Sequence, residues 1–354
     1  MVSARIHTIA LLAFAFFTSC EKEPAAPGVP PVTDERKVFI VCEGSLNNGN
    51  SQLDLYLPEK DSLFNDIYKA ANGSGLGDVL QSMIRVNDNY YLSVNNSDRI
   101  TIVNAGDFRL KQHIELSKPR YIIPAGPGLL YVSSLFQNKV YLIDTTGNNL
   151  GTISFKGNNP EGMLLYQNHV YVCPWDTAVN YIYKVGTHSN SISDSISVAG
   201  FAPQEILLDR EQKLWILSGN IAQGKPYAFT RIDPANGAIL KSYSFTSPAE
   251  VVRPAMNPAR DSIYFIQINY NGGTENNGIY RMSLHDPELP EAAFIQAQPF
   301  QYFWALGIEP ETGNIYVGDP RGFVQKGQVT VYDPAGNSLK QFSTGVGPGH
   351  FFFD

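Results

Sequence analysis

The side chains that could contact a ligand recur at two kinds of position in this chain of 354 residues. Positions of the first kind precede or open a run of strand-forming residues, and positions of the second kind lie in a polar loop between two such runs. The first set contains Asp78, Arg120, Tyr121, Glu161, Gln204, Glu205, Arg253, Trp304 and His350. The second set includes Asn95, Phe136, Trp175, Asp176, Tyr270 and Arg321.

Amide and aromatic side chains are frequent at these positions, and lysine is rare. An amide both donates and accepts hydrogen bonds. An aromatic ring adds a flat surface that contributes about 0.5–1.5 kcal/mol beyond its buried area. The combination favours a large neutral ligand with many amide or hydroxyl groups, such as a corrinoid or an oligosaccharide.

A structural role would also account for several of these residues. Asparagine is common in tight loops because it tolerates positive φ, and Trp175 and Trp304 could pack between repeats. His350 follows Pro-Gly, where a lone histidine is more often a hydrogen-bonding residue than a base. Charges of opposite sign could neutralise one another at Arg120, Glu161, Glu205 and Arg253.

Catalysis has little support in the sequence. A Gly-x-Ser-x-Gly nucleophile elbow and a His-Glu-x-x-His metal motif are both absent from the sequence. Asp78, Glu161 and Glu205 could imitate the cation site of propeller lactonases, and His350 with Glu161 could imitate a lyase pair, but no motif accompanies either arrangement. We therefore expect no enzymatic activity, no cofactor and no metal site.

These positions are organised by a repeat that begins at residue 37. Each repeat contains a β-rich run with an aromatic residue, then a polar loop, then a second β run that ends in a turn. The aromatic residues are Phe39, Tyr91, Tyr131, Tyr171, Trp215, Tyr264 and Tyr316, at intervals of 40 to 52 residues. A repeat of about 45 residues is typical of the four-stranded blade of a β-propeller. The sequence predicts an all-β, seven-bladed β-propeller over residues 37–354.

The two ends of the repeat region predict how the ring closes. The first blade, beginning at Val38, lacks a first strand, whereas the run His350–Phe353 follows the last complete blade. The C-terminal strand should therefore join blade one, which removes two exposed sheet edges. Cys42 and Cys173 then fall in blades one and four, too far apart for a disulfide, and we expect two buried free thiols.

The N-terminal residues predict export and lipidation. Residues 1–19 contain Arg5, an apolar run from Ile9 to Phe17 and small residues before Cys20, which is typical of a lipoprotein signal peptide. Ordinary secretion is the alternative. Residues 20–36 then form a Pro-rich tether. Removal of residues 1–19 leaves 25 basic and 33 acidic residues, since only Arg5 of the 26 is lost, and a net charge of −8 argues against nucleic acid as a partner.

Several motifs of the chain resemble a known family. They are Cys42-Glu43-Gly44, Ala71–Asp78, Val94–Ser97, Asn159–Met163 and Gly345–Phe351. Together they resemble the YncE-like cell-surface propeller lipoproteins of Bacteroides-type bacteria. The resemblance implies a lipid-anchored protein of the outer membrane, exposed at the cell surface. It also implies capture of cobalamin or another corrinoid and its transfer to a TonB-dependent transporter. A scaffold propeller that binds a partner protein and no small molecule is the alternative.

Overall fold

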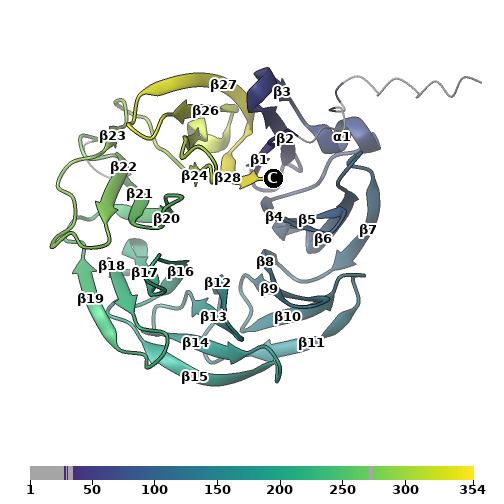
Figure 1. The fold of residues 1–354 in the computed structure, drawn as a ribbon. Helices are drawn as coiled ribbons and strands as arrows, with labels where there is room; N and C mark the ends of the chain where they lie inside the picture. Colours follow the sequence, from purple (N-terminus) through teal and green to yellow (C-terminus); the bar gives the residue numbers. More distant parts are fainter. Residues whose placement is uncertain (1–27, 29, 31–34, 271–273) are drawn as a thin grey trace, which may run out of the picture.

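The computed structural model describes residues 28, 30, 35–270 and 274–354. Their strands form seven four-stranded antiparallel sheets, arranged as blades around a central axis (Figure 1). The predicted all-β class and seven blades are thus confirmed. The predicted signal peptide (1–19), the predicted lipidation site Cys20 and most of the predicted tether (20–36) lie outside the described residues.

The first three blades each run from an innermost to an outermost strand. Blade one contains β28 (Pro348–Phe353), β1 (Val38–Cys42), β2 (Gln52–Leu57) and β3 (Ser62–Phe64). Blade two contains β4 (Leu80–Val86), β5 (Asn89–Val94), β6 (Arg99–Asn104) and β7 (Leu110–Glu115). Blade three contains β8 (Pro119–Gly126), β9 (Leu129–Ser134), β10 (Lys139–Asp144) and β11 (Asn149–Ser154).

The other four blades repeat this order. Blade four contains β12 (Pro160–Tyr166), β13 (His169–Pro174), β14 (Tyr181–Gly186) and β15 (Ser191–Ser197). Blade five contains β16 (Pro203–Leu208), β17 (Leu214–Asn220), β18 (Lys225–Ile232) and β19 (Ile239–Ser244). Blade six contains β20 (Glu250–Met256), β21 (Ser262–Ile268), β22 (Gly278–Ser283) and β23 (Ile295–Gln296). Blade seven contains β24 (Ala305–Ile308), β25 (Ile315–Asp319), β26 (Lys326–Tyr332) and β27 (Ser338–Val346).

Helical structure is confined to short segments. The α-helix α1 (Ile67–Asn72) is capped by the Asp66 side chain, which accepts a hydrogen bond from the Lys69 amide. Single 3-10 turns occupy η1 (Pro58–Lys60), η2 (Asn95–Ser97), η3 (Ile221–Gln223) and η4 (Arg321–Phe323). In the described ranges, no helix has the length and apolar character needed to cross a bilayer.

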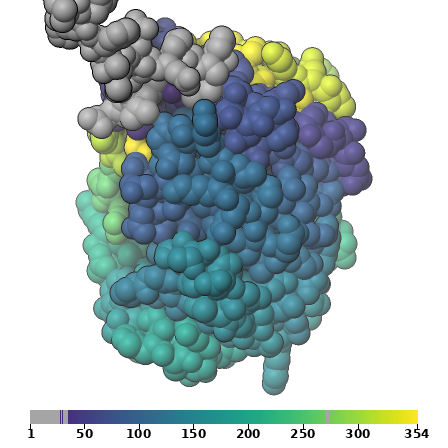
Figure 2. Space-filling model, turned by 90° about the vertical axis from the view of Figure 1, so that its right-hand side faces the viewer, coloured from purple at the N-terminus to yellow at the C-terminus, as the bar shows by residue number. Residues whose placement is uncertain are grey.

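Burial is greatest in the second strand of a blade and least in the outermost strand. The neighbouring blades cover the second strand on both faces, so all five residues of β1 are buried. The outermost strands β7 and β11 bury only one residue each, Ile114 and Ile153. They lie on the side of the molecule that faces the viewer in Figure 2.

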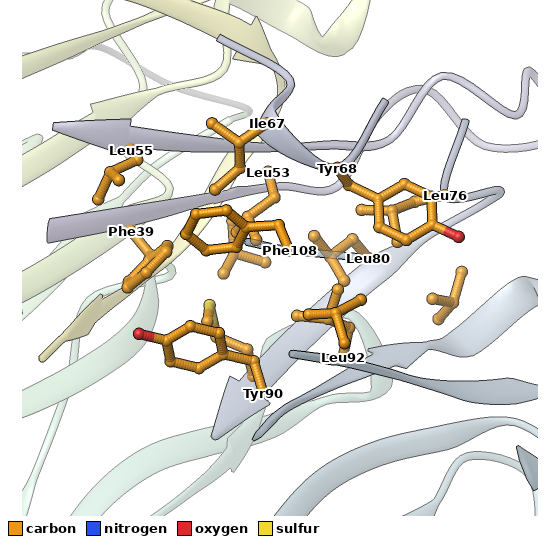
Figure 3. Packing of buried hydrophobic residues seen from close by; sticks show 14 of the residues in the cluster. Phe39, Leu53, Leu55, Ile67, Tyr68, Leu76, Leu80, Tyr90, Leu92 and Phe108 are labelled. Carbon is orange, nitrogen blue, oxygen red and sulfur yellow. The ribbon is translucent and has the colours of Figure 1, made fainter. Parts of the chain in front are cut away.

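The recurring aromatic residues pack between adjacent blades. Between blades one and two, the Phe39 ring lies 4.9 Å from the Tyr90 ring, and Tyr90 stacks against Phe108. Leu53, Ile67 and other aliphatic side chains surround them (Figure 3). Edge-to-face and offset ring contacts of this kind add stability beyond area burial. The recurring aromatic residues therefore stabilise the packing of each blade against the next.

The C-terminal strand closes the ring as predicted. β28 pairs antiparallel with β1, with Ile40 opposite Phe351 and Val41 opposite His350. The Cys42 and Cys173 thiols are free and buried, as predicted. At the end of the chain, the Asp354 carboxylate pairs with Arg85 of blade two at 2.7 Å.

A buried carboxylate joins the two blades that meet at the closure. Asp54 of β2 is fully buried and accepts hydrogen bonds from the Thr344 hydroxyl (2.6 Å) and the Gly345 amide (2.9 Å) of β27. Its other oxygen accepts from Gln52 Nε2 (2.7 Å) and the Asp66 amide (2.8 Å). One side chain thus satisfies donors from blade one and blade seven.

Asp54→Ala should destabilise the closed ring. Removing the carboxylate leaves buried donors of both blades without an acceptor, which costs about 3 kcal/mol in the free energy of unfolding. The measurement is urea unfolding followed by tryptophan fluorescence. The control Asp88→Ala removes an exposed carboxylate and should change the free energy by no more than about 0.5 kcal/mol. A loss below about 1 kcal/mol for Asp54→Ala would contradict this role.

Candidate functional site

β-Bulges direct charged and polar side chains towards the centre of the ring. The pairing of the innermost strand with its neighbour shifts register in six of the seven blades, near the start of the innermost strand in five of them and in the middle of β20, whereas β24 is regular. The residues within these shifts include Gln81, Arg120, Tyr121, Glu161, Gln204 and Arg253. Bulges re-aim side chains next to functional sites. The sequence predicted inner strands that begin after these residues in most blades, for example Met83–Val86 and Met163–Leu165, because a bulge interrupts the alternating pattern that marks a strand in sequence.

A cavity of about 420 Å³ opens between the innermost strands of blades three to six. Loop residues from the end of the ring at which these strands begin complete its wall. The lining residues are Arg120, Tyr121, Glu161, Trp175, Gln204, Glu205, Asn220, Ala222, Gln223, Tyr227, Glu250, Val252, Arg253 and Trp304. The volume lies within the range of about 300–1,000 Å³ typical of small-molecule sites.

Arg120 and Glu161 form an ion pair on one wall of the cavity. Arg120 Nε lies 3.1 Å from both carboxylate oxygens of Glu161, its Nη2 also contacts Glu161, and its Nη1 donates to Gln81 Oε1 at 2.7 Å. Burial opposes the charge of Arg120, but the Glu161 carboxylate outweighs it and raises the pKa of the guanidinium. The guanidinium is therefore charged, and its contacts with Glu161 and Gln81 hold it in one geometry.

Arg253 organises the opposite wall. The backbone of Arg253 adopts a positive φ of 55° within the bulge of β20. The guanidinium donates to Tyr121 Oη (3.1 Å), Glu43 Oε1 (3.4 Å) and the Trp304 carbonyl (3.3 Å), and it lies over the Trp304 ring. The indole Nε1 of Trp304 donates to the same Glu43 oxygen at 2.9 Å. Glu43 therefore fixes both Arg253 and Trp304.

Two carboxylates of the cavity make no such contacts. Glu205 is half-buried, and its side chain accepts no hydrogen bond from any residue in the described part of the chain; the same holds for Glu250. Burial raises the pKa of Glu205 to about 7, and the neighbouring Glu161 adds to this, whereas Arg253 and Arg120 oppose it. Burial also raises the pKa of Glu250.

The third wall combines aromatic and amide groups around a glycine. Trp175 Nε1 and Gln204 Nε2 each donate to the Gly219 carbonyl at 3.3 Å. Gly219 has a φ of 148°, and a Cβ there would lie 2.4 Å from the Tyr227 ring. Only glycine allows Tyr227 to pack so closely, which places its ring in the cavity wall.

Seven of the predicted ligand-binding residues are therefore together in the cavity wall. They are Arg120, Tyr121, Glu161, Trp175, Gln204, Arg253 and Trp304, and Glu205, which the sequence placed at the same kind of position, lines the cavity as an eighth. His350 is not in the wall, but burial and the nearby Arg253 charge lower the pKa of its imidazole to about 4. It is accordingly neutral at physiological pH.

The remaining predicted residues lie outside the cavity wall. Asn95 is buried and its amide donates to the Pro119 carbonyl, which joins blades two and three. Asp176 accepts backbone hydrogen bonds in a turn, and Arg321 is exposed in η4. Phe136 is 72% exposed, and Tyr270 stacks on Tyr302 with ring centres 5.4 Å apart.

The cavity also contains residues that were not predicted to bind a ligand. Tyr227 lies within a third strand and Glu250 at the start of an inner strand. Glu43 and Gln81 support the wall from behind. Glu43 does occur in a motif that carries the family resemblance, and its position directly after β1 was the one available signal.

A family model matches residues 36–353, almost the whole described chain, and its description is Domain of unknown function (DUF5074). The chain is a member of the DUF5074 family. A search of curated proteins gave no match. The YncE-like resemblance therefore stays a prediction for this DUF5074 protein.

Solved structures share its fold. A quinonprotein alcohol dehydrogenase-like protein from Bacteroides thetaiotaomicron is 16% identical, with a TM-score of 0.67 over 89% of this chain and 77% of its own. A candidate 6-phosphogluconolactonase from Bacteroides fragilis is 13% identical, with a TM-score of 0.65 over 92% and 99%. Hydrazine synthase from Kuenenia stuttgartiensis is 15% identical, with a TM-score of 0.60 over 74% and 85%. At these identities the similarity establishes the propeller and carries no enzymatic activity over to this chain.

Glu205→Gln should stabilise the protein in a pH-dependent way. The pKa of Glu205 rises from an ordinary 4.5 to about 7 on folding, so ionisation increasingly destabilises the native state as the pH rises from 4.5 through 7. The variant lacks this cost and should gain on the order of 2 kcal/mol at pH 8 and nothing near pH 4.5. The measurement is denaturant unfolding at both pH values.

The exposed Glu115 of β7 provides the matched control. Glu115→Gln removes the same charge from the protein but no buried carboxylate, so its stability should follow that of the unaltered protein at both pH values. An equal gain for Glu205→Gln at pH 4.5 and pH 8 would contradict ionisation as the cause.

Proposed function

We propose that this protein is a lipid-anchored ligand-capture propeller that holds a small polar molecule in the cavity between blades three and six. The observation that carries the proposal is the cavity itself. It combines aromatic walls, two arginines already fixed by acidic or carbonyl partners, and polar groups that still lack a partner. Such a mixture of apolar surface and a few oriented polar groups is characteristic of small-molecule sites.

Preorganisation supports binding over a purely structural role. The Arg120 guanidinium is held by Glu161 and Gln81, and the Arg253 guanidinium is held by Trp304, Tyr121 and Glu43, so little side-chain entropy remains to be lost when a ligand enters. The Arg120–Glu161 pair needs no ligand for its charge balance. Its function in the proposal is to shape the wall.

The loops around the cavity mouth support a second step, transfer to a membrane transporter. Large apolar side chains are exposed on loops at this end of the ring, namely Leu46 (67% exposed), Phe136 (72%), Phe300 (84%) and Val324 (85%). Exposed apolar groups that share one face are typical of protein interaction sites. In the proposal, a TonB-dependent transporter of the outer membrane covers this face and receives the ligand.

A corrinoid is the ligand that we propose to test first. A cavity of about 420 Å³ lies near the lower end for drug-sized ligands, so a corrinoid would insert one amide side chain and rest its ring on the exposed aromatic loops. Phe136 and Tyr270 would serve this outer contact. A smaller polar ligand would fit the cavity completely.

Isothermal titration with cyanocobalamin tests the corrinoid. The protein used is the mature polypeptide without its lipid, residues 20–354 with Cys20→Ser. We expect binding at micromolar concentration, weakened about tenfold or more by Trp175→Ala, because the variant removes an aromatic wall worth about 1.5 kcal/mol or more. The control Trp215→Phe alters a tryptophan buried within blade five and should leave affinity unchanged. Absence of heat would exclude the corrinoid.

Membrane anchoring has its own test. In cells that process bacterial lipoproteins, Cys20→Ser should move the protein from the outer-membrane fraction to the soluble exported fraction, because acyl chains supply the anchoring energy. Immunoblots of fractionated cells give the readout. Retention of the variant in the membrane would contradict anchoring through Cys20.

The same exposed apolar loops favour a second candidate, a scaffold propeller that binds a partner protein without cargo. Under this alternative, the exposed Phe136 and Phe300 would be required for partner binding and the cavity residues would not. Binding of a purified partner transporter to Trp175→Ala and Phe300→Ala separates the two functions.

A further inference from the structure

The charges of the cavity are unbalanced in a way that selects one class of ligand. Three carboxylates line it, those of Glu161, Glu205 and Glu250, against two guanidinium groups, those of Arg120 and Arg253. Glu43 behind the wall makes four against two, a net charge of −2 when all are ionised.

Neither arginine is available to an anion. The nitrogens of Arg120 all contact Glu161 or Gln81. Those of Arg253 contact the Trp304 carbonyl, Tyr121 and Glu43. An anionic ligand would have to displace one of these acceptors and leave it buried without a partner, which is costly.

The carboxylates of Glu205 and Glu250, in contrast, still have their acceptor capacity. No arginine or lysine of the described chain lies within ion-pair distance of either carboxylate. Glu205 is surrounded by Glu161 of β12, Arg120 and Tyr121 of β8, and Arg253 of β20, with the Cys173 thiol behind it. A cationic donor in the cavity would satisfy the Glu205 carboxylate, whereas Glu161 is already paired with Arg120.

One tryptophan ring of the wall is also open to a cation. Arg120 lies 5.7 Å from the Tyr121 ring centre, and Arg253 lies 5.5 Å from that of Trp304. No cation of the described residues lies over Trp175, the third large ring of the wall. Tryptophan is the aromatic side chain that binds cations best.

We infer that the cavity selects a ligand that carries a primary ammonium group, bound between the Glu205 carboxylate and the Trp175 ring. This inference rests on the proposed ligand-binding function and specifies the chemical class of a smaller polar ligand that fits the cavity completely, in place of a corrinoid. The ammonium donates to Glu205, and the apolar part of the ligand packs against Trp175 and Tyr227. Arg120 and Arg253 stay with their present partners.

Three probes of one shape test the charge preference. Phenethylamine, 2-phenylethanol and 3-phenylpropionate share a phenyl ring and a two-carbon chain and differ in carrying a positive, no or a negative charge. Isothermal titration of residues 20–354 with Cys20→Ser at pH 8 should show phenethylamine binding at least about tenfold more tightly than the alcohol. The carboxylate should bind most weakly.

The pH dependence identifies the residue responsible. With a pKa of about 7, the fraction of ionised Glu205 falls about tenfold between pH 8 and pH 6, and the affinity for phenethylamine should fall by a similar factor. Glu205→Gln should bring phenethylamine to the affinity of the alcohol and remove this pH dependence. Glu115→Gln, the exposed control, should keep both.

Other outcomes overturn the inference. Equal affinities for the three probes, or tighter binding of 3-phenylpropionate, would contradict selection of an ammonium group while leaving ligand binding in the cavity intact. Absence of binding by all three probes would overturn it as well, and the cyanocobalamin titration then decides whether the proposed function also fails. A pH dependence that persists in Glu205→Gln would assign the preference to another group.

Discussion

Closure of the ring is the constraint on which the rest of this structure depends. A propeller buries its blades only against one another, so one unclosed junction would expose two blade surfaces and a strand edge. Here the last strand pairs with the first, and the Asp54 carboxylate satisfies donors from blades one and seven. The closure also positions the site, because Glu43 directly follows β1 and holds Arg253 and Trp304.

The site is built on irregularities within a regular scaffold. Regular antiparallel pairing would alternate side chains between the two faces of each blade. The bulges of β8, β12, β16 and β20 instead turn residues towards the ring centre, including the consecutive Arg120 and Tyr121. Four blades thereby bring charged groups within reach of one another. Their burial makes each charge dependent on its neighbours, which is why ion pairs form and why Glu205, without one, has a raised pKa.

Much of the fold was predictable from sequence because its signals are local. One aromatic position per blade, from Phe39 to Tyr316, marked the seven repeats. A first strand missing from blade one and a surplus strand at the C-terminus indicated the closure. The site was only partly predictable. Arg120, Glu161 and Arg253 were found by their positions near the starts of predicted inner strands, whereas Asn95 and Phe136 were chosen from loops between strands and lie outside the cavity.

The sequence alone therefore determined the class of fold, the number of blades and the set of positions from which a site could be drawn. These follow from hydrophobic periodicity and turn chemistry, which act over a few residues. Only the tertiary structure decided which of those side chains meet. Bulge geometry and ring closure decide that Arg120 pairs with Glu161 and that Glu43 contacts Arg253 across 210 residues of chain. They also leave Glu205 without a hydrogen-bond or ion-pair partner among the described residues. Electrostatic interactions of buried groups depend on distance and burial in space, and local sequence specifies neither.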